Sequence, residues 1–202
     1  MIGIDPKQYG WSKPQVLPPL SYQCGFCNNI VSSVRGYKAG EHQDGSGKQI
    51  AAVYICPHCG GPTFVDTKGN YMPDVPFGSS VNHIPEDVAK LYDEARRCTS
   101  AGAYTASVML CRKILMHLSV EKKAKTGESF AYYVNYLANQ GYVPPNGKDW
   151  VDHIRKKGNE ANHEIVTMSR DDAKDLIVFL EMLLKFMYEF PKMIPPSQPS
   201  DG

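Results

Sequence analysis

The stretch CGFCNNIVSSVRGYKAGEHQDGSGKQIAAVYICPHC, residues 24–59, begins and ends with a pair of cysteines that are separated by two residues. Cys24 and Cys27 form the first pair, and Cys56 and Cys59 form the second. Two such pairs supply the four thiolates of a tetrahedral zinc site, so the spacing predicts a structural zinc ion bound by these four residues. A shell of four thiolates is closed and leaves no position for an activated water or a substrate. An activity must therefore be sought elsewhere in the chain.

The residues between the two pairs predict a small zinc ribbon. Ile30–Val34 and Ile50–Ile55 are rich in β-branched residues and are typical of short strands, while Gly36–Gln49 is typical of a loop. Strand, loop and strand is the simplest interpretation. We predict that the ribbon occupies residues 20–66 and that residues 1–19, which contain several prolines, form an extended lead-in.

The sequence Cys-Pro-His-Cys also resembles the redox pair of thioredoxin-fold disulfide oxidoreductases. Redox chemistry of that kind needs a helix after the first cysteine. The residues that follow, Gly60-Gly61-Pro62 and then Thr63–Asp66, predict a turn and a strand instead, which favours the metal site. We interpret His42 and His58 as loop residues outside the metal shell, because four cysteines already fill it.

Charge and hydropathy set limits on the partners of the chain. Lysine and arginine number 22 against 21 aspartate and glutamate residues, a formal net charge of +1, so no global field draws the protein to nucleic acid or to an anionic membrane. The longest apolar stretch, Leu176–Leu184, is short and contains Glu181. We expect a soluble cytoplasmic protein without a signal peptide or membrane contact, in a reducing compartment where thiols remain available for metal.

After a turn-rich linker at residues 67–84, the apolar residues recur with a helical period. The short links between helices favour an antiparallel bundle over residues 85–190, followed by a disordered tail at 191–202. The predicted fold is therefore mainly α, an antiparallel helical bundle preceded by a small β zinc ribbon. The first expected helix runs from Pro85 to a boundary at Gly102, the second over about Ala103–Lys125, the third from Phe130 to a stop near Gly141, and the fourth over Asp149–Lys157. The last begins with Ser169 as N-cap, with Asp172 three residues on, and ends before Pro191.

Three polar residues near the fourth expected helix form a candidate catalytic site. Arg155, Asn159 and His163 are four residues apart and share one ridge if the helix continues through Gly158. An imidazole beside a guanidinium can transfer a proton while the cation stabilises charge on a phosphoryl group, which is the chemistry of metal-independent RNA cleavage. The alternative is a structural role, in which Asn159 and His163 cap or hydrogen-bond a helix junction.

Several stretches of the chain together carry a resemblance to a known family. They are Cys56-Pro-His-Cys-Gly-Gly-Pro, Ile84–Val88, Tyr92–Arg96, Arg112–Leu115, Ile154-Arg155, Gly158-Asn159 and His163-Glu164. With these stretches the chain resembles a bacterial family of domains of unknown function, number 4145, which is grouped with the HEPN helical superfamily. The resemblance covers most of the chain and implies a HEPN-like bundle that dimerises through its bundle face.

Active members of the HEPN group are endoribonucleases that bring an Arg-Asn-x-x-x-His motif together from two protomers. Aligning Asn159 and His163 with that motif places Gly158 at the arginine position, whereas Arg155 stands three residues earlier. The resemblance implies an RNA-acting module, an endoribonuclease or toxin of a prokaryotic phage-defence or stress system. His163 would then be the general acid or base, Arg155 would stabilise the phosphate, and Asn159 would orient them.

The departure from the motif favours a second hypothesis, a catalytically inactive dimeric interaction module that binds nucleic acid or a partner protein. Basic clusters at Arg112-Lys113, Lys122–Lys125 and Arg155–Lys157 would form a phosphate-binding face if they converge, whereas charged runs on helices are usually solvated surface. The sequence leaves both hypotheses open.

Overall fold

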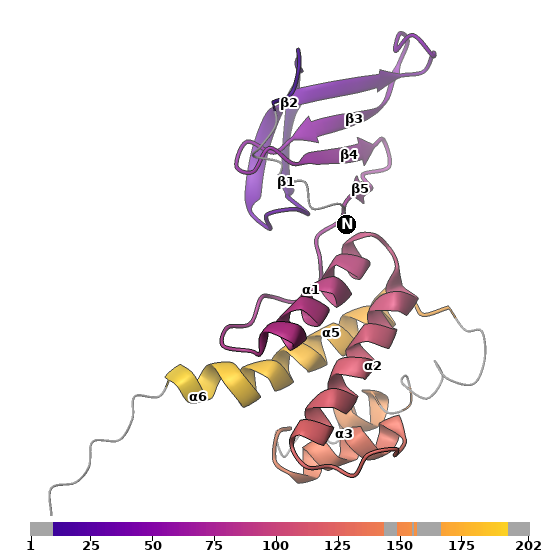
Figure 1. Cartoon of the computed structure of the whole chain (residues 1–202). Helices are drawn as coiled ribbons and strands as arrows, with labels where there is room; N and C mark the ends of the chain where they lie inside the picture. The colour runs from indigo at the N-terminus through magenta and orange to yellow at the C-terminus, as the bar shows by residue number, and fades with distance from the viewer. Residues whose placement is uncertain (1–9, 144–148, 155, 157–166, 194–202) are drawn as a thin grey trace, which may run out of the picture. The chain divides into compact units, whose positions relative to one another are not determined.

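The computed structural model describes residues 10–143, 149–154, 156 and 167–193 (Figure 1). The chain divides into two compact units, Met1–Pro76 and Phe77–Gly202, which we call unit 1 and unit 2. None of the helices in the described ranges is both long enough and apolar enough to span a membrane.

Unit 1 is built on a five-stranded antiparallel sheet in which the strands follow one another in chain order (Figure 1). The predicted fold class, a mainly α bundle preceded by a small β ribbon, is therefore wrong, because the N-terminal unit is a full sheet. The strands of the described residues are β1 Gln15–Gln23, β2 Ile30–Gly40, β3 Gln49–Ile55, β4 Pro62–Asp66 and β5 Tyr71–Met72.

The first strand lies where the prolines indicated an extended lead-in. Pro18 and Pro19 fall inside β1, at the point where its register with β2 shifts between Val16 and Leu20. β1 is an edge strand, so one side of it has no neighbour in the sheet. A proline that lacks an N–H group is tolerated there, because an edge position or an irregular pairing does not require that donor.

The second strand continues through a glycine that the sequence assigned to a loop. Gly36 pairs with Tyr54, and β2 extends to Gly40 before the chain turns. A Cβ atom at Gly36 would lie 2.0 Å from the carbonyl oxygen of Val53 and 2.8 Å from a methyl group of Leu17. Glycine is thus required here because the backbones approach closely, and it does not end the strand.

Unit 2 is helical, and the predicted positions of its main helices are confirmed. Ser169 is the N-cap of α5, and its side chain forms the expected capping box with Asp172. Residues 149–154 are also helical. The labelled helices of this unit are α1 Glu86–Ser100, α2 Tyr104–Glu121, α3 Phe130–Asn139, α5 Arg170–Leu184, the π-helix η3 Lys185–Glu189 and α6 Phe190–Met193.

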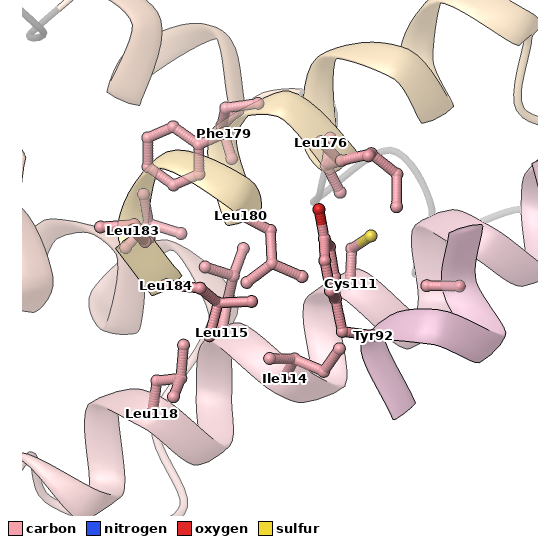
Figure 2. Packing of buried hydrophobic residues seen from close by; sticks show 14 of the residues in the cluster. Tyr92, Cys111, Ile114, Leu115, Leu118, Leu176, Phe179, Leu180, Leu183 and Leu184 are labelled. Carbon is pink, nitrogen blue, oxygen red and sulfur yellow. The ribbon is translucent and has the colours of Figure 1, made fainter. Parts of the chain in front are cut away.

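The core of unit 2 forms around α2, which contacts α1, α3 and α5. Figure 2 shows side chains of α2 and α5 converging with Tyr92 from α1. Cys111 lies fully inside this core, and burial raises the pKa of its thiol to about 12. This cysteine is therefore a small apolar core residue. The labelled α2 and α5 residues are Cys111, Ile114, Leu115, Leu118, Leu176, Phe179, Leu180, Leu183 and Leu184.

The sequence predicted that the last helix ends before Pro191. This prediction is wrong, because the helical segment continues through Pro191. α5 continues into η3 and then into α6, which includes Pro191. In the π-helical turn the N–H of Phe190 donates to the carbonyl of Lys185, five residues back. This wider turn lies directly before the proline, where an α-helix would need the N–H group that proline lacks.

Candidate metal centre

The two cysteine pairs lie in two turns of the sheet in unit 1. Cys24 and Cys27 are in the turn between β1 and β2, and Cys56 and Cys59 are in the turn between β3 and β4. Antiparallel strands alternate in direction, so the turns that follow β1 and β3 lie at the same end of the sheet. The sheet topology therefore brings together two pairs that are about thirty residues apart in sequence.

Both turns use the same backbone hydrogen bonds. Cys24 donates its N–H to the carbonyl of Asn29 at 2.9 Å, and its own carbonyl accepts from Asn28 at 2.8 Å. Cys56 donates to Gly61 and accepts from Gly60, both at 2.9 Å. Asn28 and Gly60 occupy the same place in each turn, and both have a left-handed backbone with φ of 63° and 75°. The two turns are thus structural copies of each other.

The four sulfur atoms form a compact cluster that is close enough to hold a metal ion. All of them lie within 4.8 Å of one another. The Sγ atoms of Cys24 and Cys59 are 3.8 Å apart, and those of Cys27 and Cys56 are also 3.8 Å apart. A zinc ion with Zn–S bonds of about 2.3 Å at the centre of a tetrahedron places its sulfur atoms about 3.8 Å from one another. The donor set and its dimensions fit zinc.

The thiols have different environments. Cys24, Cys56 and Cys59 are buried and Cys27 is half-buried, and all six cysteines of the chain are free of disulfides. Burial raises the pKa of Cys24 and of Cys59. Burial also acts on Cys27, but hydrogen bonds from the Asn29 backbone, neighbouring thiols and His58 outweigh it and lower its pKa to about 7. A bound cation would ionise the buried thiols, because a metal deprotonates the thiols that coordinate it.

Polar groups around the cluster complete its surroundings. Gly61 directs its N–H to Cys59 Sγ at 3.4 Å, and the side-chain amide of Asn29 lies 3.7 Å from Cys27 Sγ. Asn29 also contacts Nδ1 of His58 at 3.0 Å. The sequence indicated the glycine after the second pair but not Asn29 or Trp11, whose indole donates to the Gly60 carbonyl at 2.8 Å. Trp11 lies far from that turn in sequence, so no local pattern could reveal it.

A family model described as Domain of unknown function (DUF4145) matches residues 93–194. The chain belongs to the DUF4145 family. The match begins inside α1 and leaves out all of unit 1, so the four cysteines lie outside the DUF4145 domain. Neither the curated proteins nor the solved structures contain a match to the chain. The predicted family is thereby confirmed, and the relation to HEPN domains stays a prediction.

The predicted catalytic residues belong to the DUF4145 domain by position. Arg155, Asn159 and His163 all fall between residues 93 and 194. They lie outside the described residues, so their mutual arrangement stays a prediction from sequence.

Three basic residues of the predicted phosphate-binding clusters, Arg112, Lys122 and Lys125, make contacts inside unit 2. Lys122 pairs with Glu121 at 3.2 Å, and Lys125 pairs with Glu128 at 2.6 Å. Arg112 is buried, and its guanidinium lies 4.4 Å from the ring centre of Phe130. The charges of Lys122 and Lys125 are thus partly neutralised, and the Arg112 side chain is directed into the interior of unit 2. The predicted phosphate-binding face gains no support from them.

Proposed function

We propose that the protein binds one zinc ion through Cys24, Cys27, Cys56 and Cys59, and that this ion is structural. The observation that carries the proposal is the cluster of four sulfur atoms, with two separations of 3.8 Å that match the edge of a ZnS₄ tetrahedron. With four thiolates bound, the ion has no open position for a substrate. Its contribution would be to tie the β1–β2 turn to the β3–β4 turn.

The small core of unit 1 gives a reason for such an ion. Its buried cluster contains three of the four cysteines beside a few apolar and aromatic side chains, among them Leu17, Tyr22 and Tyr54. A unit of this size buries too little apolar surface to be very stable, and metal sites commonly supply the missing stability. The free state of all six cysteines suits a reducing cytoplasm, where we place the protein.

Metal analysis of the purified full chain tests this proposal. We expect about one zinc per chain in the wild type and a loss of zinc in Cys56→Ser. Cys98→Ser is the matched control, because Cys98 is a half-buried thiol of α1 outside the cluster, and this variant should retain its zinc. A wild-type protein isolated without metal, or a Cys56→Ser variant with full zinc content, would overturn the proposal.

We further propose that the protein acts as a homodimeric interaction module, joined along the outer face of its C-terminal helices. Val178, Met182, Phe186 and Phe190 recur every four residues along α5, η3 and α6, and together they are called the apolar stripe. Val178, Phe186 and Phe190 are between 39% and 45% exposed, which is high for such side chains. The rings of Phe186 and Phe190 are in edge contact, with centroids 5.2 Å apart.

The π-helix reduces the drift of the apolar stripe around the helix axis. An α-helix has 3.6 residues per turn, so side chains spaced by four drift steadily around its axis. The wider turn of η3 lies between Met182 and Phe190 and compensates part of this drift. A groove of about 260 Å³ runs along the stripe and is lined by its four residues together with Glu181 and Lys185. Lys185 pairs with Glu181 on the same helical segment, so this ion pair is already neutralised beside the apolar strip. An apolar strip of this kind can pack against its own copy, as a two-fold dimer requires.

The oligomeric state in solution tests the dimer. Phe186→Ser should convert a dimer to a monomer in size-exclusion chromatography with light scattering, because it removes an exposed aromatic anchor from the stripe. Met109→Ser is the control, since Met109 is a comparably exposed apolar residue of α2 outside the stripe. A monomeric wild type, or a dimer that survives Phe186→Ser unchanged, would refute this interface.

RNA cleavage is the second candidate function. Its support is the Arg155, Asn159 and His163 pattern, which lies within the family match. The test is incubation of the purified protein with mixed RNA, with chelator present to silence contaminating metal nucleases. Cleavage that disappears in His163→Ala would establish the catalytic role of that histidine. Intact RNA with the wild type would leave the interaction module as the function.

A further inference from the structure

Two buried hydroxyl groups beside the cysteine cluster have no hydrogen-bond partner among the described residues. They are the phenol of Tyr22 and the hydroxyl of Thr63. Tyr22 is 6% exposed and Thr63 is fully buried. Burial removes the water that would satisfy these groups, so native proteins leave few of them without a partner. We therefore ask whether these hydroxyls gain an acceptor when the neighbouring thiols become thiolates in the zinc-loaded protein.

The sheet places both residues on strands that lead into or out of the cysteine turns. Tyr22 lies on β1 two residues before Cys24, and Thr63 lies at the start of β4 directly after the second turn. Tyr22 belongs to the same buried cluster as Cys24, Cys56 and Cys59. Burial is the main cause of the raised pKa of Tyr22; the Thr63 hydroxyl opposes it, and the three thiols contribute to it as smaller causes.

The rings around Tyr22 hold it in this place. The Tyr71 ring stacks on the Tyr22 ring with centroids 6.3 Å apart and an interplanar angle of 22°. The Tyr54 ring is tilted, and its centroid lies 6.4 Å from that of Tyr22. The Tyr54 hydroxyl is already satisfied, because it donates to the carbonyl of Pro18 at 2.9 Å. The two tyrosines of this small core thus differ, since the Tyr54 hydroxyl has a backbone acceptor and the Tyr22 hydroxyl has no partner among the described residues.

We propose that Tyr22 donates its hydroxyl proton as a hydrogen bond to the metal-bound thiolates, and that Thr63 positions Tyr22 by donating to the phenol oxygen. The inference rests on the proposed zinc function. A neutral thiol is a weak acceptor, whereas a thiolate accepts strongly. Four thiolates carry two more negative charges than a divalent ion neutralises, so nearby donors stabilise the loaded site. A chain of two hydroxyls strengthens each bond in it.

Metal affinity of the full chain tests the role of Tyr22. Tyr22→Phe removes the hydroxyl and keeps the ring, and we expect zinc binding about 10-fold to 100-fold weaker in competition with a chromogenic chelator. Tyr54→Phe is the matched control and should bind zinc like the wild type. Thr63→Val should weaken binding in the same direction as Tyr22→Phe, and Thr63→Ser, which retains the hydroxyl, should restore it.

Cobalt substitution gives a second measurement. The absorption of the cobalt-substituted protein would not change if the Tyr22 hydroxyl only supported the fold. The thiolate-to-cobalt charge-transfer band should shift in Tyr22→Phe, because a thiolate that loses a hydrogen bond becomes a better electron donor, and it should not shift in Tyr54→Phe. Wild-type zinc affinity and an unshifted band in Tyr22→Phe would overturn the inference while leaving the zinc site intact. A wild type that binds neither zinc nor cobalt would overturn the zinc function itself.

Discussion

Single residues decide how closely the strands of unit 1 pack. Gly36 is the clearest case, because any side chain there would be directed at the backbone of β3. Its Cβ position lies 2.0 Å from the Val53 carbonyl oxygen, far inside the contact distance of two such atoms. The conflict is with backbone rather than with the end of a flexible side chain, so neither partner can move without disturbing the pairing of β2 with β3.

We therefore predict that Gly36→Ala destabilises unit 1 by about 1–3 kcal/mol or more, the usual cost of inserting atoms into a packed region. Chemical denaturation of the zinc-loaded protein, followed by tyrosine and tryptophan fluorescence, measures the change. Gly10→Ala serves as the control, because a Cβ at Gly10 meets no atom within 4 Å. Equal stability of the two variants would show that β2 and β3 are not packed as described.

At the level of the element, the start of α5 is fixed by local chemistry. The Ser169 side chain accepts from the N–H of Asp172 at 3.1 Å, and the Asp172 carboxylate accepts from the N–H of Ser169 at 2.9 Å. Asp171 and Asp172 also place negative charge at the positive end of the helix dipole. These contacts satisfy two donors that would otherwise have no partner at the helix start.

Ser169→Ala should lower the stability of unit 2 by about 1 kcal/mol, because it removes the N-cap acceptor. Thermal unfolding followed by circular dichroism at 222 nm is a suitable measurement. Ser169→Asp retains an acceptor at the cap and should stay close to the wild type. A Ser169→Asp variant as unstable as Ser169→Ala would argue that the serine acts through packing and not as a cap.

The helices could be predicted better than the strands for a physical reason. The α5 cap, its apolar period and the boundary at Gly102 are local signals. The structure has the capped helix at Ser169 and a break between α1 and α2 at Gly102. The sheet depends on pairing between distant segments. Pro18 and Gly36 look like breaks in a local window, yet an edge position and a close backbone approach make both compatible with strands.

The same distinction applies to the candidate metal centre. The cysteine spacing predicted the four-thiol cluster, because two pairs of cysteines, each with two residues between its members, suit a tetrahedral ion. Asn28, which takes the left-handed position that Gly60 takes in the other turn, could not be identified in advance, since asparagine adopts that conformation only in some contexts. Tyr22 and Thr63 enter the surroundings of the cluster through the sheet pairing, which the sequence did not reveal.

At the scale of the whole molecule, the chain combines two units that are stabilised in different ways. Unit 2 has a large apolar core formed by α1, α2, α3 and α5 and contains the whole DUF4145 match. Unit 1 has a small core in which three of the four cysteines are themselves buried members. Loss of a metal ion should therefore affect unit 1 strongly, because its core consists partly of the ligands, and should affect unit 2 little.

Hydrogen–deuterium exchange of the full chain, read by mass spectrometry with zinc bound and after removal of zinc under reducing conditions, shows whether the four cysteines hold a structural ion. We expect the amides of β1 to β4 to lose protection when zinc is removed, while the amides of α2 and α5 keep theirs. Strands that remain as protected without zinc as with it would contradict the claim that the four cysteines hold a structural ion.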